Sequence, residues 1–226
     1  MQDQNNLLGF DSLAFFGRVN ASISHELKNI MAIISETAGF MKDLSGMATE
    51  GKPIDGDMLE SSIDSIIEEI QRGFVTIRQM NRFAHSIDNP VVSVDVMDVL
   101  DLVSRLTGYL SFVGKTQIRP CIEAAPVVLT CPFILQAIVY EVVVQNFRHT
   151  EQGSVLDIIV EKRNDSAWGI LFAGFSGGAL AEFPDEWTQK MAASIGVRIE
   201  KERTDGYLEL LIPEELPAGK LAGDKP

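Results

Sequence analysis

The segment FGRVNASISHELKN, from Phe16 to Asn29, lies in a part of the sequence where apolar residues recur at intervals of mostly three and four. That spacing continues over residues 8–44 without an internal proline, and it predicts one long amphipathic helix. The positions on its apolar side are Phe10, Leu13, Gly17, Ile23, Leu27, Ile30, Ile34, Phe40, Met41 and Leu44. Helical geometry then leaves His25, Glu26 and Asn29 toward solvent, with Asn29 one turn beyond His25.

A second helical pattern follows a turn at residues 45–57, where glycines and Pro53 interrupt the apolar spacing. It covers residues 58–87 and ends before Asn89-Pro90, because the residue before a proline avoids the helical region. Residues 1–89 are therefore predicted to form a long helical hairpin. Two helices alone cannot enclose apolar stripes of this length, so we expect a homodimeric four-helix bundle. The alternative is that the stripe packs on the rest of the same chain.

Residues 90–213 show a different pattern, in which short β-rich runs alternate with helical ones. Strands are predicted at residues 91–94, 117–123, 127–130, 155–162, 168–173, 197–202 and 207–212, and helices at residues 95–112, 132–149 and 185–194. The alternation predicts an α/β sandwich built on one sheet, so the fold class of the whole chain is α+β. Residues 214–226 are small, polar and charged, and they are predicted to form a disordered tail.

The composition is that of a globular protein, with 46% hydrophobic and 23% charged residues among 226. The net charge of −13 leaves no basic surface for a phosphate backbone, which argues against nucleic-acid binding. No apolar run approaches the roughly 20 residues that cross a bilayer, and residues 1–6 do not resemble a signal peptide. We therefore expect a cytoplasmic protein that makes no membrane contact. Cys121 and Cys131 are expected to stay reduced, and three histidines argue against a zinc site.

His25 has the most reactive side chain on the solvent side of the first helix. A neutral imidazole has a free nitrogen near neutral pH and can attack phosphorus. Glu26 is placed to hold the imidazole tautomer or to act as a base, and Asn29 is placed to orient an attacking water. A histidine beside a glutamate on a helix surface is usually no more than a solvated face, so this chemistry depends on the surrounding sequence.

The segment from Phe16 to Asn29 closely resembles the H-box of bacterial two-component histidine kinases. The resemblance extends over roughly residues 10–213, because the hairpin is followed by a sandwich similar to the family's Bergerat-type ATPase domain. It implies that His25 is the phospho-acceptor and that Glu26 and Asn29 occupy the acid and amide positions of the box. The chain departs from the box at Ile30, where the family often has a proline.

The resemblance fails at the position where the family binds magnesium. An asparagine four residues after the position of Glu141 holds Mg²⁺ in the family, and this chain has Gln145 there. The neighbouring Asn146 is one residue off, which turns it by about 100° around the helix. Glu141 and Gln145 are therefore degenerate positions of a nucleotide site.

The resemblance also fails at the adenine and at the phosphates. The family places an aspartate before a glycine-rich turn, whereas this chain has GFSGG at residues 174–178, which leaves Gly174 and Gly177 without the carboxylate that recognises adenine. Only residues 179–184 stand where the family has a lid and a second glycine-rich turn, whose N–H groups bind phosphate. The sequence therefore predicts that the chain binds no nucleotide, metal or other cofactor.

A phosphorylatable histidine joined to a sandwich without an ATP site resembles the histidine phosphotransferases that are built on a degenerate kinase scaffold, such as those of sporulation and of the cell cycle. This resemblance implies that His25 takes a phosphoryl group from the aspartate of one response-regulator receiver domain and passes it to another. The receiver would supply the Mg²⁺. Arg18 and Lys28 are the nearest cations, and with Ser22 they are the candidate contacts for the receiver.

Three other functions stay open on the sequence alone. The first is a divergent histidine kinase that still phosphorylates itself. The second is a phosphatase that acts on receivers through Asn29, and the third is a non-catalytic scaffold that docks response regulators. The sequence is also compatible with a fragment of a longer sensor.

Overall fold

The computed structural model describes residues 2–49, 53, 55–119, 125–164, 166–175, 180–181, 183–202 and 206–216. The chain divides into two compact units, one of residues 17–81 and one that joins residues 1–16 to residues 82–226. This division differs from the boundary predicted at residue 89, because the two ends of the hairpin belong with the sandwich.

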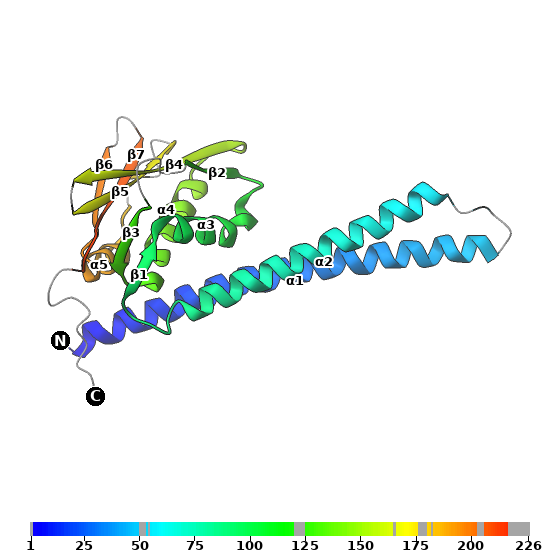
Figure 1. The fold of residues 1–226 in the computed structure, drawn as a ribbon, viewed down its shortest axis with the longest axis horizontal. Coiled ribbons are helices and arrows are strands. Elements are labelled where there is room, and N and C mark those ends of the chain that lie inside the picture. The colour runs from blue at the N-terminus through cyan, green and yellow to red at the C-terminus, as the bar shows by residue number, and fades with distance from the viewer. Residues whose placement is uncertain are drawn as a thin grey trace. The chain divides into compact units, whose positions relative to one another are not determined.

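Two long helices form the predicted hairpin. Helix α1 spans Gln2–Thr49 and helix α2 spans Gly56–His85, and the two lie antiparallel (Figure 1). Helix α1 is longer at both ends than the predicted residues 8–44. Helix α2 ends two residues before the predicted residue 87, and the N–H of Ser86 bonds to the carbonyl of Phe83 at 3.1 Å.

Complementary heptad spacings bring the two helices together within residues 17–81. On α1, positions spaced by three and four residues are buried or half-buried: Val19, Ile23, Leu27, Ile30, Ile34, Thr37, Met41 and Leu44. The corresponding positions on α2 are Leu59, Ser62, Ile66, Glu69, Gly73, Thr76 and Met80. Gly73 faces Ile30, whose Cγ2 lies 3.7 Å from the place a Cβ would occupy. The small side chains of α2 let the helices approach closely.

A second apolar seam of α2 is open to solvent. It consists of Ile63, Ile67, Ile70, Phe74 and Ile77, which are 40% to 54% exposed. Their alternating spacing of four and three residues is that of a coiled-coil seam. No described part of the chain covers these five side chains fully.

The sandwich contains the following elements in chain order. They are β1 Val92–Asp95, α3 Val96–Leu106, a 3₁₀ turn Gly108–Leu110, β2 Gly114–Arg119, β3 Val127–Thr130, α4 Pro132–Arg148, β4 Ser154–Asn164, β5 Ala167–Ala173, α5 Glu186–Ser194, β6 Arg198–Glu202 and β7 Tyr207–Pro213.

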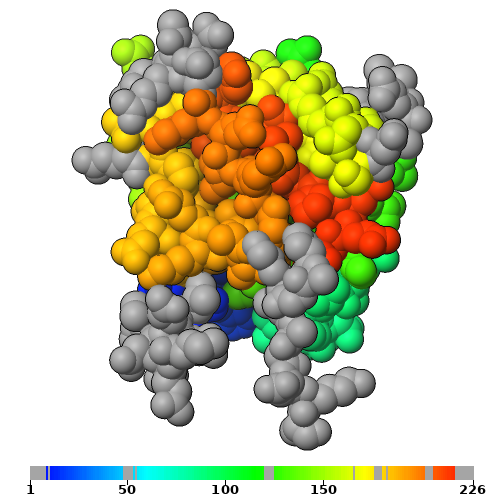
Figure 2. All heavy atoms as spheres, turned by 90° about the vertical axis from the view of Figure 1, so that its left-hand side faces the viewer, coloured from blue at the N-terminus to red at the C-terminus, as the bar shows by residue number. Residues whose placement is uncertain are grey.

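The strands form two sheets rather than the one that was predicted. Strands β1 and β3 make an antiparallel pair, and the other five make a sheet of order β2-β4-β5-β7-β6 in which only β2 and β4 are parallel. Helices α3, α4 and α5 lie on one face of the larger sheet (Figure 1). Figure 2 shows one edge of this unit, where the orange atoms of β6 lie beside the red atoms of β7. The predicted helical hairpin followed by an α/β sandwich is confirmed.

The predicted helix at residues 95–112 is too long. Helix α3 starts after Asp95, whose side chain accepts a hydrogen bond from the N–H of Met97 at 2.8 Å, and it ends at Leu106. Strand β2 then begins at Gly114, three residues before the predicted strand at 117–123. A Cβ at Gly114 would lie 2.6 Å from Cε1 of Phe147 and 2.7 Å from the carbonyl oxygen of Ser154. The strand therefore starts at a glycine because β2 and β4 approach closely there.

An aromatic cluster explains why the ends of the hairpin belong with the sandwich. Phe15 of α1 and Phe83 of α2 are fully buried, and their ring centroids lie 5.6 Å apart. Phe15 also lies 5.4 Å from Phe133 and 5.3 Å from Tyr140, both on α4, and 6.3 Å from Trp187 on α5. Aromatic contacts of this kind stabilise the fold beyond the contribution of the buried apolar area.

The predicted disordered tail begins too early, because Glu214 is held in place. Its carbonyl accepts from the N–H of Leu129 at 2.7 Å, and its own N–H donates to Ser166 at 2.9 Å. The Glu214 carboxylate pairs with Lys162 and accepts from Nε1 of Trp168 at 3.1 Å. Residues 217–226 of the predicted tail lie outside the described residues.

Candidate functional site

His25 lies on α1 with its side chain exposed. The flanking Ile23 is buried and Leu27 is half-buried, so the apolar side of the helix turns toward α2 and the imidazole turns to solvent. Asn29 is also exposed, whereas Glu26 is half-buried. The predicted solvent position of His25 and Asn29 is therefore what the structure shows.

The imidazole of His25 is in contact with Asn29. The amide nitrogen of Asn29 lies 3.3 Å from Nδ1 of His25, across one helical turn. In this orientation the amide donates to Nδ1, and the ring proton sits on Nε2. When the amide turns over, its oxygen accepts from Nδ1–H instead, and Nε2 is left unprotonated. Asn29 therefore contacts one ring nitrogen, and Nε2 is the nitrogen that a reaction partner would meet.

Glu26 does not contact the imidazole, because its carboxylate pairs with Arg72 of α2. The same guanidinium donates to both carboxylate oxygens of Glu69, at 3.2 Å and 3.3 Å. Burial by itself would lower the pKa of Arg72, but the hydrogen bonds and charges of Glu26 and Glu69 outweigh it and raise that pKa. In this arrangement Asn29, rather than Glu26, is the side chain in contact with the imidazole.

Arg72 is the residue at this site that sequence reasoning missed. It lies 46 positions from Glu26 on the other helix. The only local signal was its spacing of three residues from Glu69, which is common on solvated helices and indicates no particular site.

The predicted receiver contacts lie close to His25 on α1. Arg18, Ser22, His25 and Asn29 follow one another at intervals of four, three and four, so they share one face of the helix. Lys28 lies three residues after His25 and is exposed, as is Arg18, while Ser22 is half-buried. The candidate site is therefore a continuous strip of α1 with the imidazole inside it.

The residues at the positions where the family binds magnesium are buried or half-buried in the sandwich. Glu141 and Gln145 are half-buried on α4, and Asn146 is fully buried. The side-chain oxygen of Asn146 accepts from the hydroxyl of Thr150 at 3.3 Å. The one asparagine near the predicted position thus lies in the interior of the unit.

Gly174, the first predicted relic of the glycine-rich turn, has a structural role. Its φ is +108°, and a Cβ there would lie 2.6 Å from the carbonyl oxygen of Val155. Only glycine fits such a backbone without strain. The next residue, Phe175, is buried and donates its N–H to Gly206 at 3.0 Å. Gly177 lies outside the described residues.

The short segment predicted to stand where the family has a lid is tied to the edge of the sheet. Leu180 and Phe183 are buried, and their carbonyls accept from Nζ of Lys201 on β6 at 3.1 Å and 2.5 Å. An ammonium group can satisfy several carbonyls at once. In its described part, this segment therefore contributes apolar side chains to the core.

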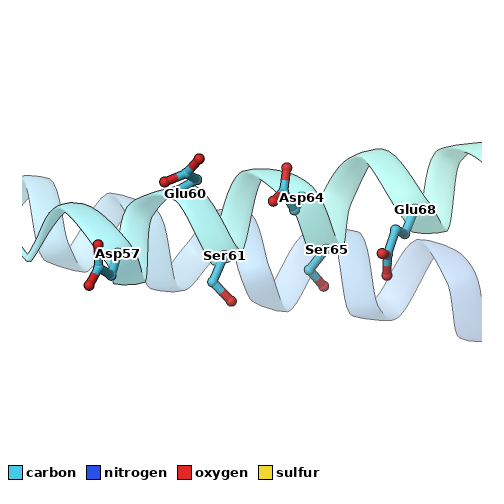
Figure 3. A pocket seen from close by; sticks show the side chains of 6 residues that line it. All are labelled: Asp57, Glu60, Ser61, Asp64, Ser65 and Glu68. Atoms are coloured by element: carbon cyan, nitrogen blue, oxygen red, sulfur yellow. The ribbon is translucent and has the colours of Figure 1, made fainter.

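Two shallow cavities lie on the hairpin. One, of about 430 Å³, is lined along α2 by Asp57, Glu60, Ser61, Asp64, Ser65 and Glu68 (Figure 3). The other, of about 380 Å³, is lined by Glu36, Thr37, Phe40, Ser61, Ser62 and Ser65. Their carboxylates repel phosphate, so neither cavity suits a phosphoryl group.

The described residues contain no cluster of histidine, cysteine and carboxylate side chains that would hold a metal ion. No described helix is both long and apolar enough to span a bilayer. Cys131 is a buried free thiol whose pKa is raised by burial, and Cys121 lies outside the described residues.

The chain was compared with known proteins at three levels. No family model matches it, and no curated protein matches it. Among solved structures it is similar to a bacterial phosphotransferase, with 12% identity over 89% of this chain and 95% of that one, at a TM-score of 0.48. It is similar to the Acinetobacter baumannii histidine kinase AdeS, with 10% identity over 84% and 98%, at a TM-score of 0.44. The cytoplasmic segment of histidine kinase QseC matches with 16% identity over 63% and 93%, at a TM-score of 0.36. These structures are two histidine kinases and a bacterial phosphotransferase.

Proposed function

We propose that this chain is a histidine phosphotransfer protein of a two-component phosphorelay. His25 carries a phosphoryl group between the aspartates of receiver domains, and ATP takes no part. The observation that carries this proposal is the exposed imidazole of His25, which Asn29 contacts at Nδ1 so that Nε2 meets the partner.

The proposed step is an in-line displacement at phosphorus. The lone pair of Nε2 attacks the phosphorus of the receiver's aspartyl phosphate and forms an N–P bond. The P–O bond to the aspartyl carboxyl group breaks, and its electron pair leaves with the carboxylate. The ring keeps its proton on Nδ1, where the oxygen of Asn29 accepts it in a hydrogen bond. The reverse step delivers the phosphoryl group to a second receiver.

The transfer needs few further catalytic groups on this chain, because holding the reacting groups in position supplies much of the rate enhancement. The developing charge on the phosphoryl oxygens is neutralised by Mg²⁺, which we assign to the receiver.

The sandwich supports a function without ATP. Asn146 is buried, Gly174 is required by its own turn, and Phe183 fills space where a lid would stand. Asn146, Gly174 and Phe183 thus each have a structural explanation in the described part of the sandwich. The sandwich is then a folded scaffold in this proposal rather than a kinase domain.

We also propose that the exposed seam of α2 pairs with a second copy of the chain. The five apolar side chains from Ile63 to Ile77 have coiled-coil spacing, and α1 adds exposed apolar residues such as Met31 and Phe40. A homodimeric four-helix bundle would bury both sets. It would also leave two copies of His25, one on each hairpin.

Receiver docking would depend on local contacts. A receiver presents an acidic phosphorylation pocket, and a chain of net charge −13 does not attract it over a long range. Arg18, Ser22 and Lys28 are the proposed contacts around His25, because they share its helix face or lie beside it. Such a relay between receiver domains would operate in the cytoplasm.

The test is to mix the purified chain with a receiver that carries labelled phosphate. We expect label on the chain, no label on His25→Ala, and normal labelling of His85→Ala, whose exposed ring pairs with Asp88 at 2.7 Å. Loss of label from the receiver without transfer would favour a phosphatase. An unchanged receiver would favour a scaffold, and labelling of the chain by ATP alone would favour a kinase.

A further inference from the structure

The guanidinium of Arg72 joins the two helices beside the reactive histidine. One of its nitrogens pairs with Glu26 of α1, and another donates to both oxygens of Glu69 one turn earlier on α2. The side chain of Glu69 is 16% exposed, that of Glu26 is 28% exposed and that of Arg72 is 47% exposed. The planar guanidinium can bind two carboxylates in this way, which a lysine could not do with the same geometry.

The position of Glu26 creates an electrostatic problem for the proposed reaction. Glu26 follows His25 directly in the sequence and points about 100° away around the helix. Its carboxylate does not contact the imidazole, but its charge lies on the same helical turn as the arriving phosphoryl group. A phosphoryl group carries about −1.5 to −2 charges at neutral pH, and a free carboxylate nearby would repel it. The ion pair with Arg72 offsets that charge and draws the carboxylate toward α2.

We propose that Arg72 is a positioning residue for phosphoryl transfer at His25, acting through Glu26. The inference rests on the proposed function, because it concerns the charge that the transferred group meets. Arg72 holds the Glu26 carboxylate on the α2 side of the hairpin and cancels its charge there. The imidazole is then oriented by Asn29 alone, and Glu26 does not act as its base.

The experiment measures the rate at which labelled phosphate passes from a phosphorylated receiver to His25. The variants are Arg72→Ala, Glu26→Gln and the two together, and Arg78→Ala serves as control because it removes an exposed arginine from the same helix. We expect Arg72→Ala to slow the transfer about tenfold, which corresponds to about 1.4 kcal/mol. Glu26→Gln and Arg78→Ala should each stay within about threefold of the parent rate, since a factor of three is below 1 kcal/mol.

The double variant decides between a role through Glu26 and a merely structural one. If Arg72 acts by cancelling the charge of Glu26, the double variant should recover to the rate of Glu26→Gln, because no charge is left to cancel. The defect of Arg72→Ala should also shrink as salt is added. A double variant as slow as Arg72→Ala, or an Arg72→Ala variant at the parent rate, would overturn the inference. If the parent chain accepts no label, the proposed function itself has failed.

Discussion

Asn29 lies one helical turn beyond His25, and its amide nitrogen is 3.3 Å from Nδ1 of the imidazole. The contact engages Nδ1, so Nε2 is the ring nitrogen that the proposed transfer would use. A hydrogen bond of this kind contributes about 1 kcal/mol, enough to favour one arrangement of the ring about fivefold.

Replacing Asn29 should therefore change the transfer rate without changing the fold. We expect Asn29→Ala to slow the phosphorylation of His25 about fivefold, the loss of about one hydrogen bond. Asn29→Asp keeps an acceptor at Nδ1 and should retain more of the rate. Single-turnover transfer from a labelled receiver measures both variants. Equal rates for the parent chain and Asn29→Ala would show that the contact has no part in the reaction.

The turn at Gly174 should be needed for stability whether or not a nucleotide binds. Gly174→Ala places a Cβ 2.6 Å from a backbone oxygen at a positive φ. We expect it to lower the free energy of unfolding by roughly 2–4 kcal/mol. Gly153→Ala is the matched control, because its φ is +89° but nothing lies within 4 Å of the added Cβ. Gly153→Ala should lower the free energy of unfolding by only about 1 kcal/mol. Urea unfolding measures both, and equal losses would contradict the steric explanation.

The salt bridge of Glu214 should make stability depend on pH in the acid range. The hydrogen bond from Lys162 lowers the pKa of Glu214 in the folded chain. A carboxyl group whose pKa is lower in the folded chain than in the unfolded chain stabilises the fold at pH values above its unfolded-state pKa of about 4.3. This contribution disappears as the pH falls through the folded-state pKa.

Glu214→Gln removes that contribution at neutral pH. The variant should therefore unfold at a lower urea concentration than the parent chain at pH 7. The two urea midpoints should converge as the pH falls below about 4.3, the usual pKa of glutamate. Glu186→Gln offers a control, because Glu186 also has a lowered pKa but pairs with Lys190 on its own helix. A difference between Glu214→Gln and the parent that does not change with pH would show that the salt bridge is not its source.

The exposed seam of α2 should hold the chain as a dimer. Ile70→Asp puts a charge in the middle of the seam, and we expect it to shift the mass in solution from twice 24.9 kDa toward 24.9 kDa. Ile87→Asp, at a residue that is 55% exposed and lies beyond α2, should leave the dimer intact. Analytical ultracentrifugation distinguishes these masses. A parent chain that is monomeric at tens of micromolar would contradict the four-helix bundle.

Much of the fold could be predicted from the sequence because its signals are local. The spacing of apolar residues gave the hairpin, and the strand at residues 127–130 matches β3 in both limits. The end of α3 and the start of β2 were placed wrongly, because Gly114 is required by Phe147 and Ser154, which are distant in sequence.

Contacts between residues distant in sequence also limited what could be predicted of the candidate site. The exposure of His25 and Asn29 followed from helical geometry within α1. The partner of Glu26 is on another helix, 46 residues away, and no periodicity within α1 indicates it. The ordered position of Glu214 likewise depends on Lys162 and Trp168, which lie on other strands.

The most direct measurement of the central claim follows labelled phosphate through the chain in the absence of ATP. A phosphorylated receiver should label the parent chain on His25, and a second, unphosphorylated receiver should then remove that label. His25→Ala should stay unlabelled, while His85→Ala should behave like the parent chain. If phosphate instead reaches the chain only when ATP is supplied, or reaches a residue other than His25, the chain is not a phosphotransfer protein of this kind.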